Sequence, residues 1–397
     1  MSNKIHIIAS PQTWIEGEAV RQLEATAQFA GMLRCVGLPD LHPGKGSPVG
    51  AAFLADRLYP FLVGSDAGCG MGVWTSDLPA NKAKIDKMAE RCNGLDQPWD
   101  GDTTAWLQQR GIAATVHDAG LGSPGFGNHF IEVQQVTAVM DPAEFIALGM
   151  SEDHLCLTVH SGSRGFGEAI LHAYVARHGA GGVAADSPEG QFYLQQSQHA
   201  LAWAVANREL CAQRALDALQ TQGSHVLDIC HNSVTPMDFD GHQAWLHRKG
   251  AAPADKGVVV IPGSRGDESY IVRPINGSET SLWSLAHGAG RKISRGEAHG
   301  KLVNLYRQKD MRLNRWGGKL VCGDSDLLWE EAPQCYKPIG SVIADMLAAQ
   351  LIHVIATVRP LVTFKTSEGF KEQSRDERKK WQLARGEARE LKRKIGK

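Results

Sequence analysis

The sequence of 397 residues predicts a mixed α/β fold that forms one large domain. Apolar runs of strand length alternate along the chain with helical patterns. No internal repeat and no low-complexity linker interrupts the chain before residue 366. Apolar residues make up 43% and charged residues 21%, which is the balance of a globular protein. We therefore expect strands with surrounding helices over residues 1–365, followed by a basic extension over residues 366–397.

Three segments carry the periodicity of helices. Residues 16–33 have apolar side chains near helical spacing, and residues 191–219 form the longest helical pattern. Residues 339–358 form a third amphipathic pattern, which Pro360 ends. We expect the apolar positions of the longest helix to lie in the core rather than in a functional site.

Short apolar and β-branched runs predict the strands, and most of them end at a loop that contains glycine or histidine. In α/β architectures ligands gather at such junctions between strand and loop. The predicted strands cover residues 60–64, 129–133, 155–159, 226–230, 257–261 and 361–365.

Composition excludes a membrane protein. No apolar run reaches the ~18 residues that cross a bilayer, and the N-terminal segment lacks the features of a signal peptide. We expect a cytoplasmic protein without a membrane partner. The eight cysteines form no Cys-x-x-Cys pair, so most should be reduced core residues.

Charge is distributed unevenly along the chain. The formal net charge is only −1, but residues 366–397 contain 11 Lys/Arg and 6 Asp/Glu. A basic extension of this kind can bind a polyanion, or it can form a solvated helix. Both interpretations stay open at this point.

Five side chains that bind metals lie at junctions between strand and loop. Thiolate and imidazole ligands favour zinc or a late transition metal, while carboxylate also admits manganese. The alternative is that these are unrelated core histidines and a buried cysteine in a turn. This alternative is the weaker one, because all five side chains lie at junctions between strand and loop. The residues are Asp66, Cys69, His129, His160 and His231.

His287 is followed by three small residues, Gly288, Ala289 and Gly290, and then by several cations. Small residues let backbone N–H groups approach an anion closely. An imidazole nitrogen is also a competent nucleophile toward phosphorus. On this segment alone, a glycine turn beside a buried, hydrogen-bonded histidine is the stronger interpretation, because short motifs match by chance. The rest of the chain reverses this preference and favours a histidine that handles a phosphate.

Taken in order, these residues give the chain a resemblance to the RtcB family of RNA ligases over most of residues 35–365. No single motif is decisive, but the ordered set is highly specific. The motifs are PDLH at 39–42, DAGCGM at 66–71, GNHFIE at 127–132, HSGSRG at 160–165, HN at 231–232, HRKGA at 247–251, IPGS at 261–264, HGAGR at 287–291 and a strand lysine at 365.

The resemblance implies an RtcB-like domain with a central cleft for metal and nucleotide. It also implies a GTP-dependent RNA ligase, acting in RNA repair or tRNA splicing. Such an enzyme joins a 3′-phosphate or 2′,3′-cyclic phosphate end to a 5′-hydroxyl end. His287 is then the guanylylated residue, and GMP passes from it to the RNA, which gives an RNA-ppG intermediate.

The same resemblance implies cofactors and contacts. Two Mn²⁺ ions, with Zn²⁺ or Co²⁺ as alternatives, are bridged by Cys69 and bound by the other four metal-ligand candidates. Predicted RNA contacts are Arg164, Arg208, Arg248 and Lys249. Predicted nucleotide contacts are Asn128, His129, Phe130, Ile131, Glu132, His231, Asn232, Pro262, Gly263, Ser264, Arg265, Ser269, His287, Gly288, Ala289, Gly290 and Lys365.

Three departures from the family pattern qualify the resemblance. Ser123, Pro124 and Phe126 interrupt the glycine run before Asn128, Ala67 replaces a β-branched residue, and the chain continues for 32 residues beyond residue 365. The extension suggests a branch that acts on damaged RNA, such as ribosomal RNA or tRNA, with an activating or release-factor-like protein as a further partner. The rival functions are a metal-dependent cyclic-phosphate phosphohydrolase and a non-catalytic RNA-binding relative.

Overall fold

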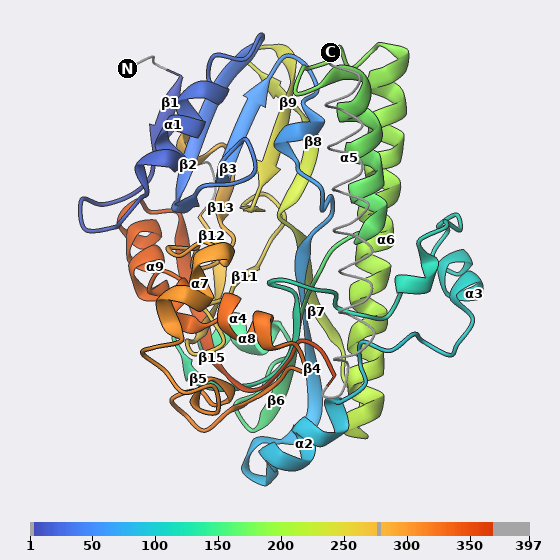
Figure 1. Ribbon diagram of the computed structural model, residues 1–397, viewed down its shortest axis with the longest axis vertical. Helices are drawn as coiled ribbons and strands as arrows, with labels where there is room; N and C mark the ends of the chain where they lie inside the picture. Colours follow the sequence, from blue (N-terminus) through green and yellow to red (C-terminus); the bar gives the residue numbers. More distant parts are fainter. Residues whose placement is uncertain (1–3, 276–278, 368–397) are drawn as a thin grey trace.

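The computed structural model describes residues 4–275 and 279–367, and it confirms a mixed α/β fold (Figure 1). Two sheets form the centre of the molecule. The first has the strand order β1-β2-β3-β9-β8, and all its neighbours are antiparallel except β1 and β2. Its strands are β1 (Ile5–Ile7), β2 (Met32–His42), β3 (Val49–Ala55), β8 (Asn232–Phe239) and β9 (His242–Lys249).

The second sheet is larger and carries most of the strand ends that matter for function. Its order is β11-β12-β15-β5-β6-β4-β7, and β14 pairs in parallel with β15 outside this path. A separate pair joins β10 (Ala251–Pro253) to β13 (Ser284–Ala286). The strands are β4 (Gly70–Pro79), β5 (Phe130–Val139), β6 (His154–Ser161), β7 (His225–Cys230), β11 (Val259–Ile261), β12 (Ser269–Pro274), β14 (Lys319–Val321) and β15 (Ile352–Phe364).

Helices cover the outer faces of the sheets. The long helix α6 runs along nearly the whole height of the molecule, with α5 beside it (Figure 1). The helices of the described chain are α1 (Gly17–Thr26), α2 (Ile85–Cys92), α3 (Thr103–Gln108), α4 (Pro142–Ala147), α5 (Gly165–His178), α6 (Pro188–Leu219), α7 (Arg295–Leu302), α8 (Ser325–Glu330) and α9 (Ile339–Ala348).

The largest apolar cluster joins the two sheets. Val36 and Leu54 of the first sheet belong to the same buried cluster as Val73 and Ile229 of the second. The chain also passes directly between the sheets, since β7 ends at Cys230 and β8 begins two residues later. This crossing places the residue between them, His231, where the sheets meet.

Three predicted elements are wrong at least in part. Residues 60–64 form a 3₁₀ turn over Pro60–Leu62 instead of a strand, because a proline suits the first turn of a helix. The first helix ends at Thr26. The last helix ends at Ala348, and the β-branched run that follows belongs to β15, which continues through Pro360. The remaining predicted helix and strands are confirmed within a few residues.

Two further expectations concern cysteines and the C-terminus. All eight cysteines are free and seven of them are buried, as expected. Thr366 and Ser367 belong to the packed domain rather than to an extension: the Ser367 backbone N–H donates to Asp96 Oδ2 at 2.9 Å. The rest of the predicted extension, residues 368–397, lies outside the described residues. No helix within the described ranges combines the length and apolarity that a membrane span needs.

Candidate metal and nucleotide site

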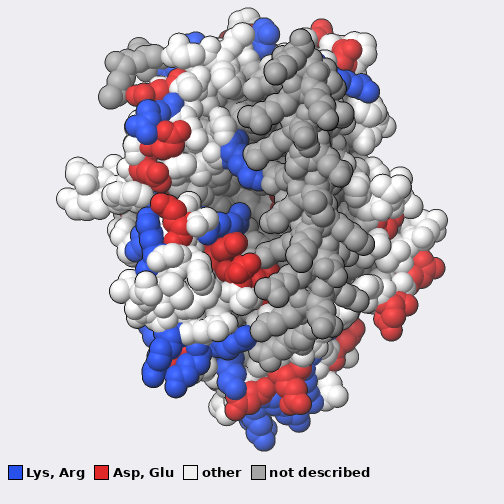
Figure 2. Space-filling view, viewed as in Figure 1, with Lys and Arg blue, Asp and Glu red and all other residues white. Residues whose placement is uncertain are grey.

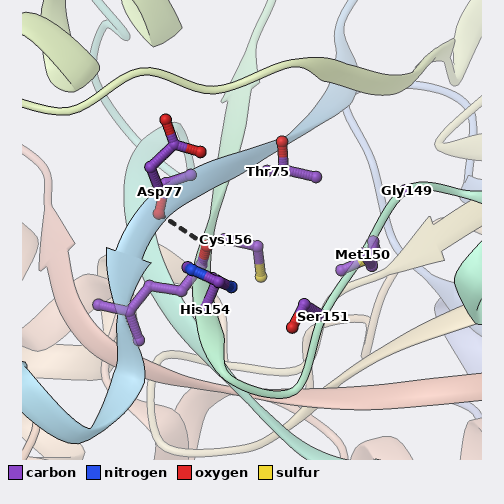
Figure 3. A pocket seen from close by; sticks show the side chains of 9 residues that line it. Thr75, Asp77, Gly149, Met150, Ser151, His154 and Cys156 are labelled. Carbon is purple, nitrogen blue, oxygen red and sulfur yellow. Dashed lines mark hydrogen bonds between the residues drawn. The ribbon is translucent and has the colours of Figure 1, made fainter.

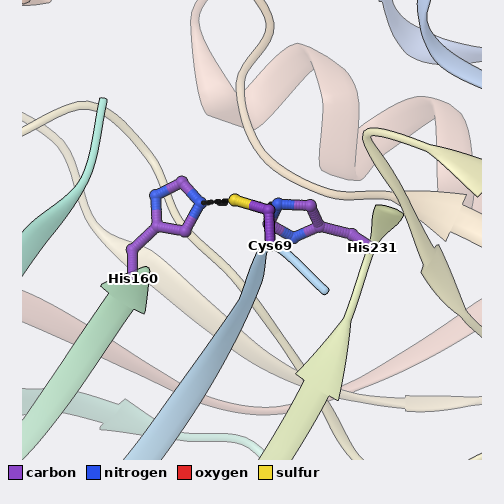
Figure 4. A group of neighbouring side chains, drawn as sticks. All are labelled: Cys69, His160 and His231. Carbon is purple, nitrogen blue, oxygen red and sulfur yellow. Dashed lines mark hydrogen bonds between the residues drawn. The ribbon is translucent and has the colours of Figure 1, made fainter. Parts of the chain in front are cut away.

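The five predicted metal ligands come together in one largely buried cluster, of which Figure 4 shows Cys69, His160 and His231. Cys69 Sγ lies 3.3 Å from Nε2 of His129 and 3.3 Å from Nε2 of His160. His160 Nε2 lies 3.4 Å from His231 Nε2, and Asp66 Oδ2 lies 2.9 Å from His129 Nε2. Two sets of three ligand atoms share Cys69, each set within 4.8 Å. Either set can hold a metal ion.

Sheet pairing explains why residues so distant in sequence meet here. Strand β4 lies between β6 and β7, and Gly70 at its start pairs with Ser161 on one side and Cys230 on the other. The start of β4 and the ends of β6 and β7 therefore lie at the same edge of the sheet. In Figure 4, Cys69, His160 and His231 emerge beside one another from this edge. A side chain on Gly70 would collide with the Ile229 carbonyl, so the close approach requires glycine.

The chemistry of the cluster fits a divalent cation. Nδ1 of His129 and Nδ1 of His231 are buried and have no hydrogen-bond partner among the described residues, which is costly for a protein on its own. Burial, together with neighbouring histidines, lowers the pKa values of His160 and His231 well below the ordinary range. Their imidazoles are therefore neutral, which is the form that binds metal.

The two acidic side chains of the cluster, Cys69 and Asp66, have pKa values that are shifted in opposite directions. Burial and the Asp66 carboxylate raise the pKa of the Cys69 thiol well above its usual value, so a thiolate here requires a cation. Burial opposes ionisation of Asp66 as well, but His129 and Arg164 outweigh it and lower the pKa of this carboxyl. A metal ion would supply the positive charge that Cys69 lacks.

His287 lies beside the cluster and is held by Asp40, a residue of β2 that is completely buried. Asp40 Oδ2 accepts hydrogen bonds from the His287 backbone N–H at 3.1 Å and from its Nδ1 at 2.6 Å. The ring centres of His287 and His231 are 4.8 Å apart. The predicted phosphate-handling histidine thus has a fixed orientation next to the candidate metal ligands.

Two glycines make this arrangement possible. Gly250 and Gly290 both have positive φ, at +60° and +72°. A Cβ on Gly250 would lie 2.8 Å from His287 Cε1, and one on Gly290 would lie 2.3 Å from the Asp40 carbonyl oxygen. A larger residue at either position would displace the histidine or its carboxylate.

Lys365 fastens the loop that carries two of the predicted contacts. Its Nζ donates to the carbonyl of Gly127 at 2.8 Å and to that of His129 at 3.0 Å. Burial lowers the pKa of this lysine to about 8. Asn128 lies between the two carbonyls, so the lysine holds its backbone at the edge of the metal cluster.

Glu132 is a buried carboxyl whose hydrogen-bond donors are neutral. Its oxygens accept from Thr363 Oγ1 at 2.5 Å and from Gln134 Nε2 at 2.7 Å. Gln134 Nε2 also lies 3.3 Å from Ser269 Oγ. Burial raises the pKa of Glu132 to about 7, although Thr363, Gln134 and Lys365 oppose the shift.

Several other predicted contacts have side chains that are already engaged. Asn232 donates to the Asp66 carbonyl at 3.0 Å and accepts from the Gly250 N–H at 2.7 Å, so it braces the metal loop. The guanidinium of Arg265 donates to three backbone carbonyls, those of Met311, Leu328 and Glu331. Arg265 can therefore offer a ligand little beyond its backbone.

The remaining predicted contacts lie around the same edge. Ile131 is buried in an apolar cluster, whereas the Phe130 ring packs edge-on against His160 with centres 5.5 Å apart. Ser264 Oγ donates to Asp267 at 2.8 Å. The loop at Gly288 approaches the loop at Pro262, whose carbonyl oxygen would lie 3.3 Å from a Cβ on that glycine.

Two of the four predicted RNA contacts are structural instead. Arg208 is fully buried and its guanidinium donates to Asp228 Oδ2 at 2.7 Å. Arg248 is 1% exposed and donates to Asp255 Oδ1 at 3.0 Å and to Ser284 Oγ at 3.0 Å. Neither guanidinium is accessible to an RNA phosphate, because both are buried. The prediction failed here because a pattern of charges in a sequence does not show which of them are buried.

The other two predicted cations lie nearer the site. Lys249 is 8% exposed and donates to Ser47 Oγ at 2.6 Å. The backbone N–H of Arg164 donates to Asp66 Oδ1 at 3.3 Å, and its guanidinium fills the space that a side chain on Gly125 would need. Both remain predictions as RNA contacts.

Sequence reasoning missed the group around Glu331. This buried carboxylate pairs with Arg291 at 3.1 Å and with Arg295 at 3.2 Å, and it accepts from the Tyr336 hydroxyl. No signal in the sequence marks Glu331, since its partners come from other segments. Asp40 was also given no role, although an acid within the apolar run of β2 is a usable signal.

A small surface pocket lies away from the cluster (Figure 3). Its volume is about 110 Å³, below the range of roughly 300–1,000 Å³ that is typical of ligand pockets. It lies around the paired residues Thr75 and Cys156, four residues along β4 from Met71, which pairs with His160. The separation is about 13 Å at strand spacing, so this pocket is not part of the metal site.

Comparison with known proteins assigns the family. The family model described as tRNA-splicing ligase RtcB matches residues 22–96 and 102–366. The RNA-splicing ligase RtcB2 of Escherichia coli is 43% identical over 375 residues, which cover 94% of this chain and 98% of the relative. The RNA-splicing ligase RtcB of Mycobacterium tuberculosis is 28% identical, covering 86% of this chain and 99% of the relative. The tRNA-splicing ligase RtcB of Archaeoglobus fulgidus is 28% identical, covering 87% and 91%. The chain therefore belongs to the RtcB family.

Proposed function

We propose that this protein is a GTP-dependent RNA ligase that joins RNA ends bearing a 3′-phosphate or 2′,3′-cyclic phosphate to 5′-hydroxyl ends. The observation that carries the proposal is the pair of Asp40 and His287 beside the cluster of metal ligands. A metal-dependent phosphohydrolase that attacks phosphorus with water needs the metal ligands but requires no histidine nucleophile. The family assignment supports RNA as the substrate.

His287 is the proposed nucleophile. Asp40 accepts a hydrogen bond from Nδ1–H, which leaves the lone pair of Nε2 available for attack. Nε2 forms a bond to the α-phosphorus of GTP while the bond to the bridging oxygen breaks and pyrophosphate leaves. Positive charge develops on the imidazole, and the buried Asp40 carboxylate stabilises it.

The metal ligands complete the site. We propose that two Mn²⁺ ions occupy the two sets of ligands that share Cys69. Such ions supply positive charge to the transferring phosphoryl group. Asn232 and Arg164 contribute by holding the Asp66 loop in place.

Buried polar groups around Glu132 and Lys365 are proposed to position the nucleotide. Lys365, which directly follows β15, holds the loop at Asn128 and places a buried ammonium there. Glu132 can accept hydrogen bonds from guanine N–H groups, which adenine does not present in the same pattern. Burial raises the pKa of Glu132, so the ionised carboxylate is stabilised by any further hydrogen-bond donor that a ligand brings.

The RNA steps follow from the same chemistry. An oxygen of the RNA 3′-phosphate attacks the phosphorus of the histidine adduct, and the N–P bond breaks to release His287. The 5′-hydroxyl then attacks the RNA phosphorus, and GMP leaves as the new phosphodiester forms. A cyclic phosphate is first opened by water to give the 3′-phosphate.

Covalent labelling tests this proposal. The protein is incubated with manganese and GTP labelled at the α-phosphate, denatured, and examined for bound label. We expect acid-labile, alkali-stable label that disappears in His287→Ala. Asp40→Asn should slow labelling about a hundredfold or more, since it removes the carboxylate that orients the ring.

A matched control is His172→Ala, because His172 lies on the exposed face of α5. This variant should label like the unaltered protein. Label that persists in His287→Ala would contradict the proposed nucleophile. No label with GTP or ATP under several metals, combined with cyclic-phosphate hydrolysis, would favour the phosphohydrolase.

A further inference from the structure

The segment that follows His287 is strongly basic, although carboxylates from other segments lie near some of its cations, such as Asp267 at 4.0 Å from Arg315. Residues 291–319, which we call the basic platform, contain nine Lys/Arg and two Asp/Glu in a chain of net charge −1. Figure 2 shows Lys and Arg gathered at the lower left, over the loops that follow α7. The exposed cations of the platform include Lys292, Lys309 and Arg315. Such a concentration of positive charge attracts a polyanion.

The platform is held in a defined shape by hydrogen bonds. Asn314 Oδ1 accepts from the backbone N–H of Trp316 at 3.0 Å and of Gly318 at 2.7 Å. Its Nδ2 donates to the Pro360 carbonyl in β15 at 2.8 Å. One side chain therefore closes the turn and fastens it to the central sheet. The turn presents Arg315, whose guanidinium carbon lies 4.2 Å from the centre of the Trp316 ring.

Apolar and aromatic side chains lie among these cations. Leu305 is 72% exposed, Leu313 is 53% exposed and Tyr306 is 39% exposed. Exposed apolar side chains that lie together often mark a surface that binds a partner. Aromatic rings and planar guanidinium groups interleaved with cations are the features with which proteins bind single-stranded nucleic acid, since bases stack on the planes and phosphates pair with the charges.

The platform is continuous with the proposed catalytic site. Arg295 donates to Asn128 Oδ1 at 3.4 Å, and it pairs with Glu331 at 3.2 Å. Arg265, in the loop predicted to contact the nucleotide, donates to the Met311 carbonyl at 3.0 Å. A chain that leaves the site near Asn128 therefore meets the basic platform directly.

We propose that the basic platform binds the single-stranded segment of the substrate RNA adjacent to the end that is joined. Phosphates pair with Lys309 and Arg315, and a base stacks on the plane formed by Arg315 and Trp316. Recognition is independent of base sequence, because it uses phosphates and ring faces. This inference rests on the proposed function for its substrate, but it can fail or hold separately.

The test compares two charge reversals of equal size. The platform variant is Lys309→Glu with Arg315→Glu, and the control is Arg177→Glu with Lys256→Glu, whose cations are exposed on α5 and on the loop after β10. A third variant, Trp316→Ala, removes the stacking ring. Binding of a fluorescent single-stranded RNA with a 3′-phosphate is measured by polarisation over a series of salt concentrations, and thermal melting checks that each variant is folded.

We expect the platform variant to weaken RNA binding at least tenfold and to reduce the slope of log Kd against log salt by about 1.4, for two phosphate contacts on a single strand. Trp316→Ala should weaken binding roughly fivefold or more. All three variants should still form the covalent GTP adduct, since their substitutions lie outside the site of His287.

Three results would overturn the inference. Unchanged affinity and salt slope in the platform variant would indicate that the surface serves another partner, such as an acidic protein. An equal loss of affinity in the control variant would indicate that the effect comes from the net charge of the protein and not from the platform. Failure of the unaltered protein to bind RNA would show that RNA is not the ligand of this surface. Absence of the GTP adduct alongside platform-dependent RNA binding would instead contradict the proposed function and leave the platform intact.

Discussion

Two buried polar regions lie next to each other at the edge of the larger sheet, one around Arg208 and the other around Cys69. They differ in whether all their polar atoms have hydrogen-bond partners. On one side, the guanidinium of Arg208 donates to Asp228 and to the carbonyls of Gly68 and Ser161. On the other side, the ligand cluster leaves Nδ1 of His129 and of His231 without a partner among the described residues. The first region is complete within the protein, whereas the second requires a ligand.

The satisfied region supports the unsatisfied one. Arg208 binds the carbonyls at positions 68 and 161, and these residues adjoin Cys69 and His160. The guanidinium thus holds the backbone next to two of the candidate metal ligands. A buried cation can therefore serve function through position alone, without touching a substrate.

Breaking the satisfied pair should have the largest effect on stability. Arg208→Met leaves the Asp228 carboxylate without its cation and should reduce the free energy of unfolding by about 3–5 kcal/mol. Chemical denaturation of the metal-free protein measures this loss. Adding Asp228→Asn should recover part of it, and a single variant as stable as the unaltered protein would show that the pair is not structural.

Glu132 should behave in the opposite way, because neutral donors alone bond to its buried carboxyl among the described residues. Burial raises its folded-state pKa from 4.5 to about 7. Ionisation therefore costs folding free energy progressively from about pH 4.5 to 7, and this cost is complete above pH 7. Glu132→Gln should be more stable than the unaltered protein by up to about 3 kcal/mol at pH 8.

That gain should shrink toward zero near pH 4.5, where both proteins carry a neutral group at position 132. Paired denaturation curves at several pH values test it. The same variant should discriminate less between GTP and ATP in the labelling assay. A stability difference that is independent of pH would contradict the assignment of the cost to ionisation.

Metal binding should sharpen the contrast through an effect on stability that depends on the free metal concentration. Manganese at a hundred times its dissociation constant should stabilise the unaltered protein by about 2.7 kcal/mol per independent site. Because Cys69 belongs to both sets of ligands, Cys69→Ser should reduce binding at both, whereas His231→Ala should affect one. Metal titration of the chelated protein gives the stoichiometry, and equal losses in the two variants would contradict a shared cysteine.

The sequence predicted that the five candidate metal ligands lie together, because the signal for this is local. Each ligand follows or precedes a short apolar run, and neighbouring strands bring their ends to one edge. Asp66 and Cys69 meet His129, His160 and His231 as expected. The strand pairing that unites them, with β4 between β6 and β7, is not visible in the sequence, since pairing depends on contacts between distant segments.

What sequence reasoning missed depends on burial. Arg208 and Arg248 have the same residue type as a surface RNA contact, and only the fold reveals that carboxylates neutralise them in the core. Residues 352–358 lie in the predicted helical pattern, but their β-branched side chains and their pairing with β5 and β12 make them a strand. The roles of Asp40 and Glu331 likewise arise from partners far away in the chain.

The central claim is that His287, oriented by Asp40, carries the guanylate, and peptide mapping tests it most directly. After reaction with labelled GTP, trypsin should release residues 266–291, a peptide that contains a single histidine. The account predicts that this peptide carries the label and that acid removes it, as expected for a bond between nitrogen and phosphorus. Label on any other peptide, or an acid-stable adduct, would contradict the claim.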